Sequence, residues 1–89
     1  MTYIVDIEFI ETSVFTKQAE KLLDDASYRA LQQLLVEQPK SGTVIPGCGG
    51  LRKLRWKGSG RGKAGGLRII YYFAQVDHTC LLLYAYAKN

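Results

Sequence analysis

The sequence predicts a single α+β domain over residues 1–89, in which one strand is followed by two helices and then by three strands. Three observations indicate this class. The N-terminal residues alternate between apolar and polar with the period of a strand, and two apolar stripes with helical spacing come next. After a glycine-rich stretch the period of two returns. A chain of 89 residues forms one domain with a small core.

The N-terminal strand lies in TYIVDIEFI, where apolar residues on one side alternate with acids on the other. Its buried side consists of Tyr3, Val5, Ile7 and Phe9. Two apolar stripes with helical spacing predict helices over about 13–23 and 25–38. The second helix ends there because Pro39 disfavours a helical conformation in the residue before it. The side chain of Thr12 or Ser13 can cap the first helix by accepting a hydrogen bond from its first turn, and Asp24 or Asp25 can cap the second in the same way.

The C-terminal half begins with KSGTVIPGCGG, whose glycines and proline predict a loop. Strands are then expected over 51–57, 67–74 and 79–86, with a basic glycine-rich hairpin loop over 58–66 and a turn at 76–78. The last strand is apolar on both faces, which indicates a central or doubly covered position. In the strand over 51–57, alternation gives one basic side, made of Lys53, Arg55 and Lys57.

Charge divides the chain into two unlike halves. Residues 1–43 contain seven of the 8 acidic residues and four of the 12 basic residues. Residues 44–89 contain eight basic residues and a single acidic one, Asp77. A basic face of this kind commonly binds a polyanion such as RNA or DNA, and a solvated basic surface is the alternative. Arg68 lies on the strand after the loop and can face Lys53 and Arg55 across antiparallel pairs.

Other classes of site find little support in the sequence. The two cysteines and one histidine have no metal-ligand spacing, so neither a metal nor a cofactor is expected. The acidic N-terminus does not resemble a signal peptide and no run is long enough to span a membrane, which favours a cytoplasmic protein with reduced thiols. Gly60 to Gly65 match G-x-G-x-x-G, but a strand follows where a dinucleotide site needs a helix, and Ala64 replaces the hydroxyl of a Walker loop.

The basic face has the composition of a site that cleaves RNA without a metal. Arginine and lysine donors can stabilise the charge that builds on a phosphate under attack by the neighbouring 2′-hydroxyl. No carboxylate lies between Gln38 and Val76, so we consider a lysine as the proton acceptor, and Lys53 is the best candidate by position. Tyr84 or Tyr86 can stack on a base or donate a proton, although tyrosines on an apolar strand more often pack in the core.

The residues GGLRKLRWKGSGRGKAGGLRIIYYF and LLLYAYAKN, in the order β-α-α-β-β-β, resemble the RelE/ParE superfamily of bacterial toxins and its HigB-type branch most closely. The resemblance implies a small, mostly antiparallel sheet with both helices packed on one face. It also implies the toxin of a type II toxin–antitoxin system: a ribosome-dependent mRNA endoribonuclease, neutralised by a helix-turn-helix antitoxin.

On this resemblance, the catalytic residues are expected to be Lys53, Arg55, Arg68 and Lys88, and the RNA-binding residues Arg52, Lys57, Arg61, Lys63 and Tyr86. Family members usually continue into a C-terminal helix, whereas this chain stops at Asn89, so we expect a weakly stable domain that dimerises or needs its antitoxin. The alternatives are a relative that acts by binding, either inactive or directed at gyrase as in the ParE branch, and a basic regulator that binds nucleic acid.

Overall fold

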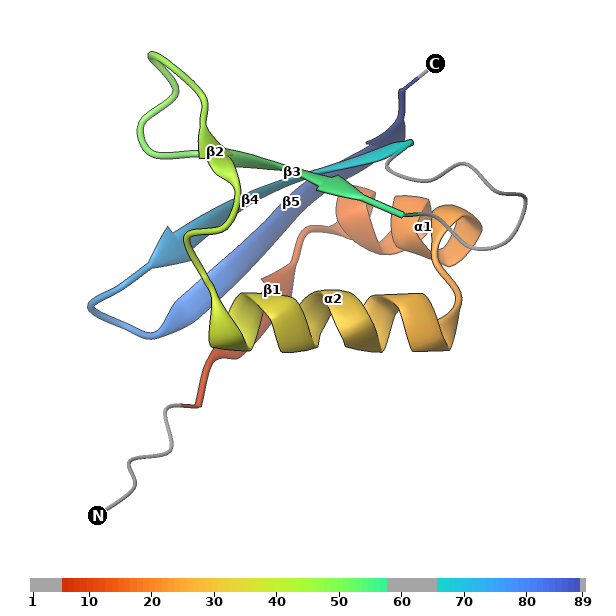
Figure 1. Ribbon diagram of the computed structural model, residues 1–89, viewed down its shortest axis with the longest axis horizontal. Coiled ribbons are helices and arrows are strands. Elements are labelled where there is room, and N and C mark those ends of the chain that lie inside the picture. The colour runs from red at the N-terminus through yellow and green to blue at the C-terminus, as the bar shows by residue number, and fades with distance from the viewer. Residues whose placement is uncertain (1–5, 58–65, 89) are drawn as a thin grey trace.

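The computed structural model describes residues 6–57 and 66–88 and contains two helices and one five-stranded mixed sheet (Figure 1). In chain order the elements are β1 (Glu8–Glu11), α1 (Ser13–Leu22), α2 (Asp25–Glu37), β2 (Thr43–Val44), β3 (Arg52–Trp56), β4 (Leu67–Ala74) and β5 (Thr79–Ala87). The strand order in the sheet is β1-β5-β4-β3-β2. The expected α+β fold, with two helices after the first strand, is confirmed.

The helix ends follow the local sequence. The Thr12 side chain accepts a hydrogen bond from the Phe15 N–H at the start of α1, and the Asp24 side chain accepts one from the Ser27 N–H at the start of α2. These bonds satisfy N–H groups that a helix leaves without an internal partner. The two helices therefore begin where the sequence predicts, with only a short connection between them.

The first strand differs from its prediction in extent. It begins at Glu8, whose N–H donates to the His78 carbonyl, and it pairs in parallel with β5, opposite Thr79 to Leu82. Its start is thus set by the start of its partner, which local alternation cannot reveal. Part of the predicted strand, residues 2–5, lies outside the described range.

A second difference is β2, because the sequence predicted only loop between α2 and β3. Its two residues pair antiparallel with β3, and a turn closed by the Ile45 N–H and the Leu51 carbonyl connects the two strands. Gly47, Gly49 and Gly50 have positive φ in this turn, a conformation that L side chains disfavour. The glycines that indicated a loop are therefore the glycines that make this hairpin possible.

The core lies between the helices and one face of the sheet. Side chains from both helices and three strands form one buried cluster, which includes Phe15, Leu31, Leu35, Leu54, Ile69, Tyr71 and Leu82. Strand β5 lies between β1 and β4, so its predicted central position is confirmed. In the described part of the chain, however, the two helices contribute to the core on this face alone, and we call the other side the open face.

Candidate nucleic-acid interface

Three basic residues predicted to share a face are neighbours in the sheet. In the antiparallel pairing of β3 with β4, Arg55 lies directly opposite Arg68, and Lys53 lies opposite Ile70. Their neighbours Leu54 and Ile69 point into the core, so alternation places these three cations on the open face. Directly opposed side chains have Cβ atoms about 5 Å apart, and like charges at that distance repel.

The exposure of these cations differs. Lys53 and Arg55 are exposed, whereas Arg68 is half-buried and donates from Nη1 to the Leu67 carbonyl at 3.1 Å. Strands β3, β4 and β5 contain no Asp or Glu, so these strands place no carboxylate opposite Lys53 or Arg55. An anion from outside the sheet would relieve the repulsion.

Two further predicted residues extend the same end of the open face. The Lys88 N–H donates to the Gly66 carbonyl at 2.7 Å, which carries the β4–β5 ladder one residue past Ala87. Continued alternation places Lys88 on the side of Tyr86. Lys57 follows β3 directly and is exposed. The predicted residues Arg61 and Lys63 lie outside the described ranges, in 58–65.

Arg52 lies apart from this group. Its Nη1 donates to the Gly42 carbonyl at 2.7 Å and to the Lys40 carbonyl at 3.2 Å, in the connection that follows α2. In the same connection, the buried Tyr71 hydroxyl donates to the Pro39 carbonyl and accepts from the Gly42 N–H. Arg52 thus supports the chain between α2 and β2, and the structure does not bring it to the open face with Lys53 and Arg55.

Two tyrosines join the basic residues. Tyr86 lies opposite Arg68. In the next row Tyr84 lies opposite Ile70, which separates it from Lys53. Their ring centroids are 5.8 Å apart and the rings are tilted by 47°. Tyr84 is 45% exposed, which overturns the expectation that tyrosines on this strand pack in the core. Lys88 could have indicated that Tyr84 is exposed. It lies four residues after Tyr84 and so points to the same side of the strand, and a lysine does not belong in a core.

Trp56 and His78 lie outside the basic group. Trp56 packs against the core and donates from Nε1 to the Ser27 Oγ at 3.1 Å, so it does not join the open face. His78 is an exposed turn residue with a φ of 50°. Neither residue adds to the basic group.

The pKa shifts that the structure resolves lie away from the open face. Burial, and then the hydrogen bond to Glu11, raises the pKa of the Tyr28 hydroxyl well above its usual range. Burial raises the pKa of the Cys80 thiol to about 12. Both groups therefore remain neutral at physiological pH and serve the interior, the tyrosine as a hydrogen-bond donor and the cysteine as a small apolar side chain.

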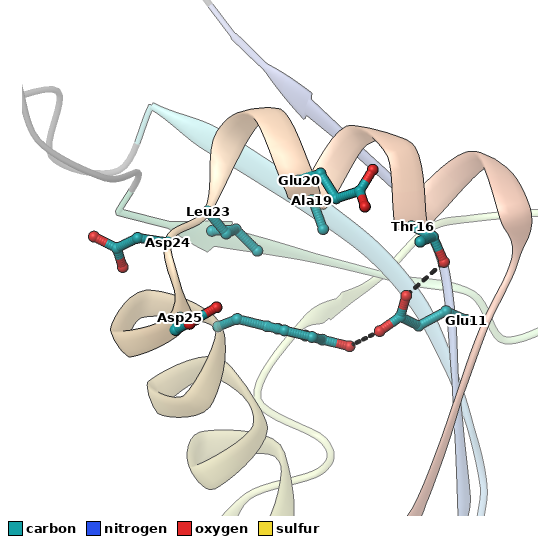
Figure 2. Close-up of a pocket in the computed structure, with 8 residues that line it drawn as sticks. Glu11, Thr16, Ala19, Glu20, Leu23, Asp24 and Asp25 are labelled. Carbon is teal, nitrogen blue, oxygen red and sulfur yellow. Dashed lines mark hydrogen bonds between the residues drawn. The ribbon is translucent and has the colours of Figure 1, made fainter.

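A pocket of about 210 Å³ lies between α1, α2 and β1, on the helix side of the molecule (Figure 2). Four carboxylates line it, and Glu11 accepts hydrogen bonds from the Tyr28 and Thr16 hydroxyls. The negative charge of these carboxylates disfavours the binding of a phosphate in the pocket. In the described ranges, no three His, Cys, Asp or Glu side chains gather closely enough to hold a metal ion. The pocket and the basic group are thus separate features of opposite charge.

The arrangement on the open face suits a phosphodiester. The exposed Lys53 and Arg55 and the half-buried Arg68 present cationic donors from two adjacent strands, and such donors bind phosphate oxygens. Because the strands fix the backbone of each donor, little reorganisation is needed when charge develops between them.

Within the described ranges, no helix is long and apolar enough to cross a membrane.

No protein-family profile matches the sequence. Among solved structures, the chain is similar to one in the intact E. coli RelBE toxin–antitoxin complex, with a TM-score of 0.64 and 16% identity over 94% of this chain and 98% of that one. It is also similar to the isolated E. coli RelE toxin, with a TM-score of 0.65 and 14% identity over 94% of this chain and 86% of that one. At such identities the likeness concerns the fold, and the chain has a RelE-like fold.

Proposed function

We propose that this protein is the toxin of a type II toxin–antitoxin system and that it cleaves mRNA as a ribosome-dependent endoribonuclease of the HigB type. The observation that carries the proposal is the direct opposition of Arg55 and Arg68 on the open face, beside Lys53, in a chain with a RelE-like fold. Two guanidinium groups on directly opposed residues can both donate to the oxygens of one phosphate.

In the proposed mechanism, Arg55 and Arg68 hold the scissile phosphate from two sides. The 2′-oxygen of the preceding ribose attacks phosphorus, and negative charge builds on the non-bridging oxygens. The two guanidinium groups stabilise that charge through hydrogen bonds that strengthen in the transition state. Loss of one such donor typically lowers the rate about 10²–10³-fold.

Lysines carry the proton transfers. Lys53 accepts the proton of the attacking 2′-hydroxyl, while Lys88 gives a proton to the departing 5′-oxygen. The bond from the 2′-oxygen to phosphorus forms and the bond to the 5′-oxygen breaks. The products are a 2′,3′-cyclic phosphate and a free 5′-hydroxyl.

The remaining predicted residues bind RNA around this centre in our proposal, namely Lys57, Arg61, Lys63 and Tyr86. Arg52 instead acts through the connection that it supports, since its guanidinium donates to two backbone carbonyls there. The proposed partners are mRNA, ribosomal RNA and a helix-turn-helix antitoxin, with the cytoplasm as the place of action. The likeness to a chain of the RelBE toxin–antitoxin complex supports the antitoxin.

Expression in a bacterial host tests the proposal. Wild-type protein should arrest growth and produce new in-frame mRNA 5′ ends that carry hydroxyl groups. Lys53→Ala should abolish both effects. Lys53→Arg keeps the positive charge but removes the group that can accept a proton, so it should retain RNA binding and lose cleavage. Arg29→Ala is the matched control, because it removes one exposed charge from α2 and should leave cleavage unchanged.

The outcomes separate the proposed function from its alternatives. Cleavage that survives in Lys53→Arg would exclude the proton transfer to Lys53 while leaving the phosphate site in place. Growth arrest with inhibited gyrase and intact mRNA would contradict the proposal and indicate a relative that acts by binding. Salt-dependent RNA binding without arrest or cleavage would instead indicate a regulator.

A further inference from the structure

Strand β5 contains an irregularity that decides on which side of the sheet its last residues lie. The cross-strand partner of Ile70 is Tyr84, yet the partner of the next residue, Tyr71, is Leu82. Leu83 is therefore one residue more than the ladder needs, as in a β-bulge. The bulge divides β5 into a half that pairs with both β1 and β4 and a half that leads into the basic group.

The bulge brings Lys88 to the open face. Before it Leu82 is buried, and after it Ala85 is buried, so two successive inward residues are separated by three positions and not two. Counted by twos from Leu82, Lys88 would point toward the helices. Because of the extra residue it lies instead on the side of Arg68, and Tyr84 changes side with it.

On that face, Lys88 lies within reach of a phosphate held by the arginines. Arg68 lies opposite Tyr86, and Lys88 is two residues further along β5, so the two cations are diagonal neighbours. Diagonal neighbours are about 7–8 Å apart, a span that long side chains can close. The Lys88 N–H is paired with the Gly66 carbonyl, so the place of this lysine depends on the course of the second half of β5.

The second half of β5 has a neighbouring strand on one side only. Strand β1 ends at Glu11, opposite Leu82, so within residues 6–57 and 66–88 only β4 pairs with β5 beyond the bulge. Backbone groups on the other edge then need partners from elsewhere. Helix α1, which follows β1 almost directly, is in a position to supply them.

The start of α1 takes the place of a strand along this edge. The Thr12 N–H donates to the Leu82 carbonyl at 3.0 Å, and the Thr12 hydroxyl donates to the Leu83 carbonyl at 2.8 Å. Further along the helix, the Gln18 side-chain oxygen accepts a hydrogen bond from the Ala85 N–H at 2.7 Å. Backbone groups at the bulge and after it are thus held by α1.

We propose that Thr12 and Gln18 are positioning residues, which act through the bulge of β5 to hold Lys88 at the scissile phosphate beside Arg68. The inference rests on the proposed function, in which Lys88 gives a proton to the leaving oxygen. It adds a requirement at a distance from the reacting atoms, because both residues act along the edge of β5. Gln18 is the better test of the two, since Thr12 also caps α1.

The first test measures binding to a short single-stranded RNA in which 2′-O-methyl groups replace the 2′-hydroxyls, so that it cannot be cleaved. The logarithm of the binding constant falls linearly with the logarithm of the salt concentration, and each lost phosphate contact reduces the slope by about one. Lys88→Ala should therefore reduce the slope by about one. Gln18→Leu should reduce it similarly although it removes no charge, and Gln18→Glu, which keeps a side-chain oxygen, should restore it.

A double-mutant cycle shows whether the two residues act on one contact. If Gln18 acts through Lys88, the variant that carries both Gln18→Leu and Lys88→Ala should have the slope of Lys88→Ala alone, because one contact can be lost only once. Gln33→Leu is the matched control, since the same substitution removes a hydrogen bond to Glu37 within α2 and should leave the slope unchanged. Adding of the two single effects in the double variant overturns the proposal.

The second test uses ribosomes and a message in which sulfur replaces the 5′-oxygen that leaves on cleavage. A thiolate leaves without a proton, so loss of the general acid does not slow such a message. Gln18→Leu should lower the single-turnover rate on the ordinary message about 10²-fold and cleave the sulfur-containing one at close to the wild-type rate. Arg55→Ala should be slow on both. If Gln18→Leu is equally slow on both, it does not act through Lys88 and the proposal is overturned.

The remaining outcomes keep this inference apart from the proposed function. If Gln18→Leu lowers the melting temperature but leaves the salt slope unchanged, Gln18 is merely structural and its positioning role is overturned. Reduced slopes in Gln18→Leu and Lys88→Ala, with no cleavage by wild-type protein on the ribosome, support the positioning of Lys88 at a phosphate and contradict the proposed function. Lys88→Ala with the wild-type slope removes Lys88 from the phosphate, and the inference falls while Arg55 and Arg68 keep their roles.

Discussion

The two faces of the sheet are built from the same strands but differ in every physical respect. On the face that the helices cover, Leu54, Ile69 and Leu82 are at most 9% exposed and belong to one continuous core. On the open face lie Lys53 and Arg55, both exposed, and Tyr84, which is 45% exposed. Burial of apolar surface stabilises the first face, whereas opposed positive charges destabilise the second.

This contrast shows how one sheet can separate folding from function. Neighbouring residues in a strand point to opposite sides, so a substitution on one face leaves most contacts of the other unchanged. We therefore expect substitutions on the covered face to act on the free energy of unfolding, and substitutions on the open face to act on RNA. Four predictions test this separation.

The largest effect should come from Leu82→Ala, which removes a fully buried side chain from the centre of the core. The loss of buried surface and the cavity that remains should lower the free energy of unfolding by about 2–5 kcal/mol. Urea denaturation followed by circular dichroism measures it. Leu81→Ala, one residue away on the half-buried open side, is the matched control and should cost about 1 kcal/mol. Equal losses would contradict the distinction between the faces.

The next effect belongs to the open face. Arg55→Ala should lower the rate of RNA cleavage about 10²–10³-fold, because one donor to the phosphate is lost. Its melting temperature should stay the same or rise slightly, since the repulsion from Arg68 disappears. Single-turnover kinetics and thermal unfolding on the same preparation provide both numbers. A clear fall in melting temperature would mean that Arg55 stabilises the fold.

A smaller effect is expected at Tyr71, whose hydroxyl joins the covered face to the connection after α2. Tyr71→Phe removes the donor to the Pro39 carbonyl and the acceptor for the Gly42 N–H. Leaving these groups unpaired should cost about 1–3 kcal/mol in unfolding free energy. Tyr72→Phe removes a hydroxyl from the open face, and its change should stay within about 0.5 kcal/mol. A neutral Tyr71→Phe would show that water replaces the hydroxyl readily.

The smallest effect concerns pH. Burial raises the pKa of Cys80 from the ordinary 9.0 to about 12 in the folded protein. The unfolded chain therefore loses this proton first, so the contribution of Cys80 to stability is complete below about pH 9 and declines as the pH rises toward 12. Unfolding midpoints between about pH 9 and 11 should fall less steeply in Cys80→Ala than in wild type. Identical slopes would contradict the burial of the thiol.

Much of the fold could be predicted because its signals are local. The caps at Thr12 and Asp24, the apolar stripe of α2 and the alternation of β3 and β4 each depend on residues a few positions apart. The same alternation predicted that Lys53 and Arg55 share a side, and it predicted correctly that Arg68 joins them. Charge asymmetry and alternation together were enough to find the centre of the candidate site.

Other features escaped prediction because they depend on contacts between distant segments. Arg52 alternates with Lys53 and therefore lies on the same side of β3 as the buried Leu54. Only the folded chain brings the carbonyls of Lys40 and Gly42 within reach of its guanidinium group. Strand β2 exists through its pairing with β3. Tyr84 was missed as an exposed residue because the bulge that turns it outward is held by α1, more than sixty positions earlier in the chain.

The sequence by itself therefore determined the order of the elements other than β2, the ends of both helices and a basic side on β3, since each follows from the chemistry of neighbouring residues. Only the tertiary structure decided that β1 joins β5 in parallel, that Arg52 supports the chain after α2, and that the tyrosines of β5 lie beside the arginines. The physical reason is that the side to which a strand residue points depends on register, and register is set by the partner strand and the helix that packs on it.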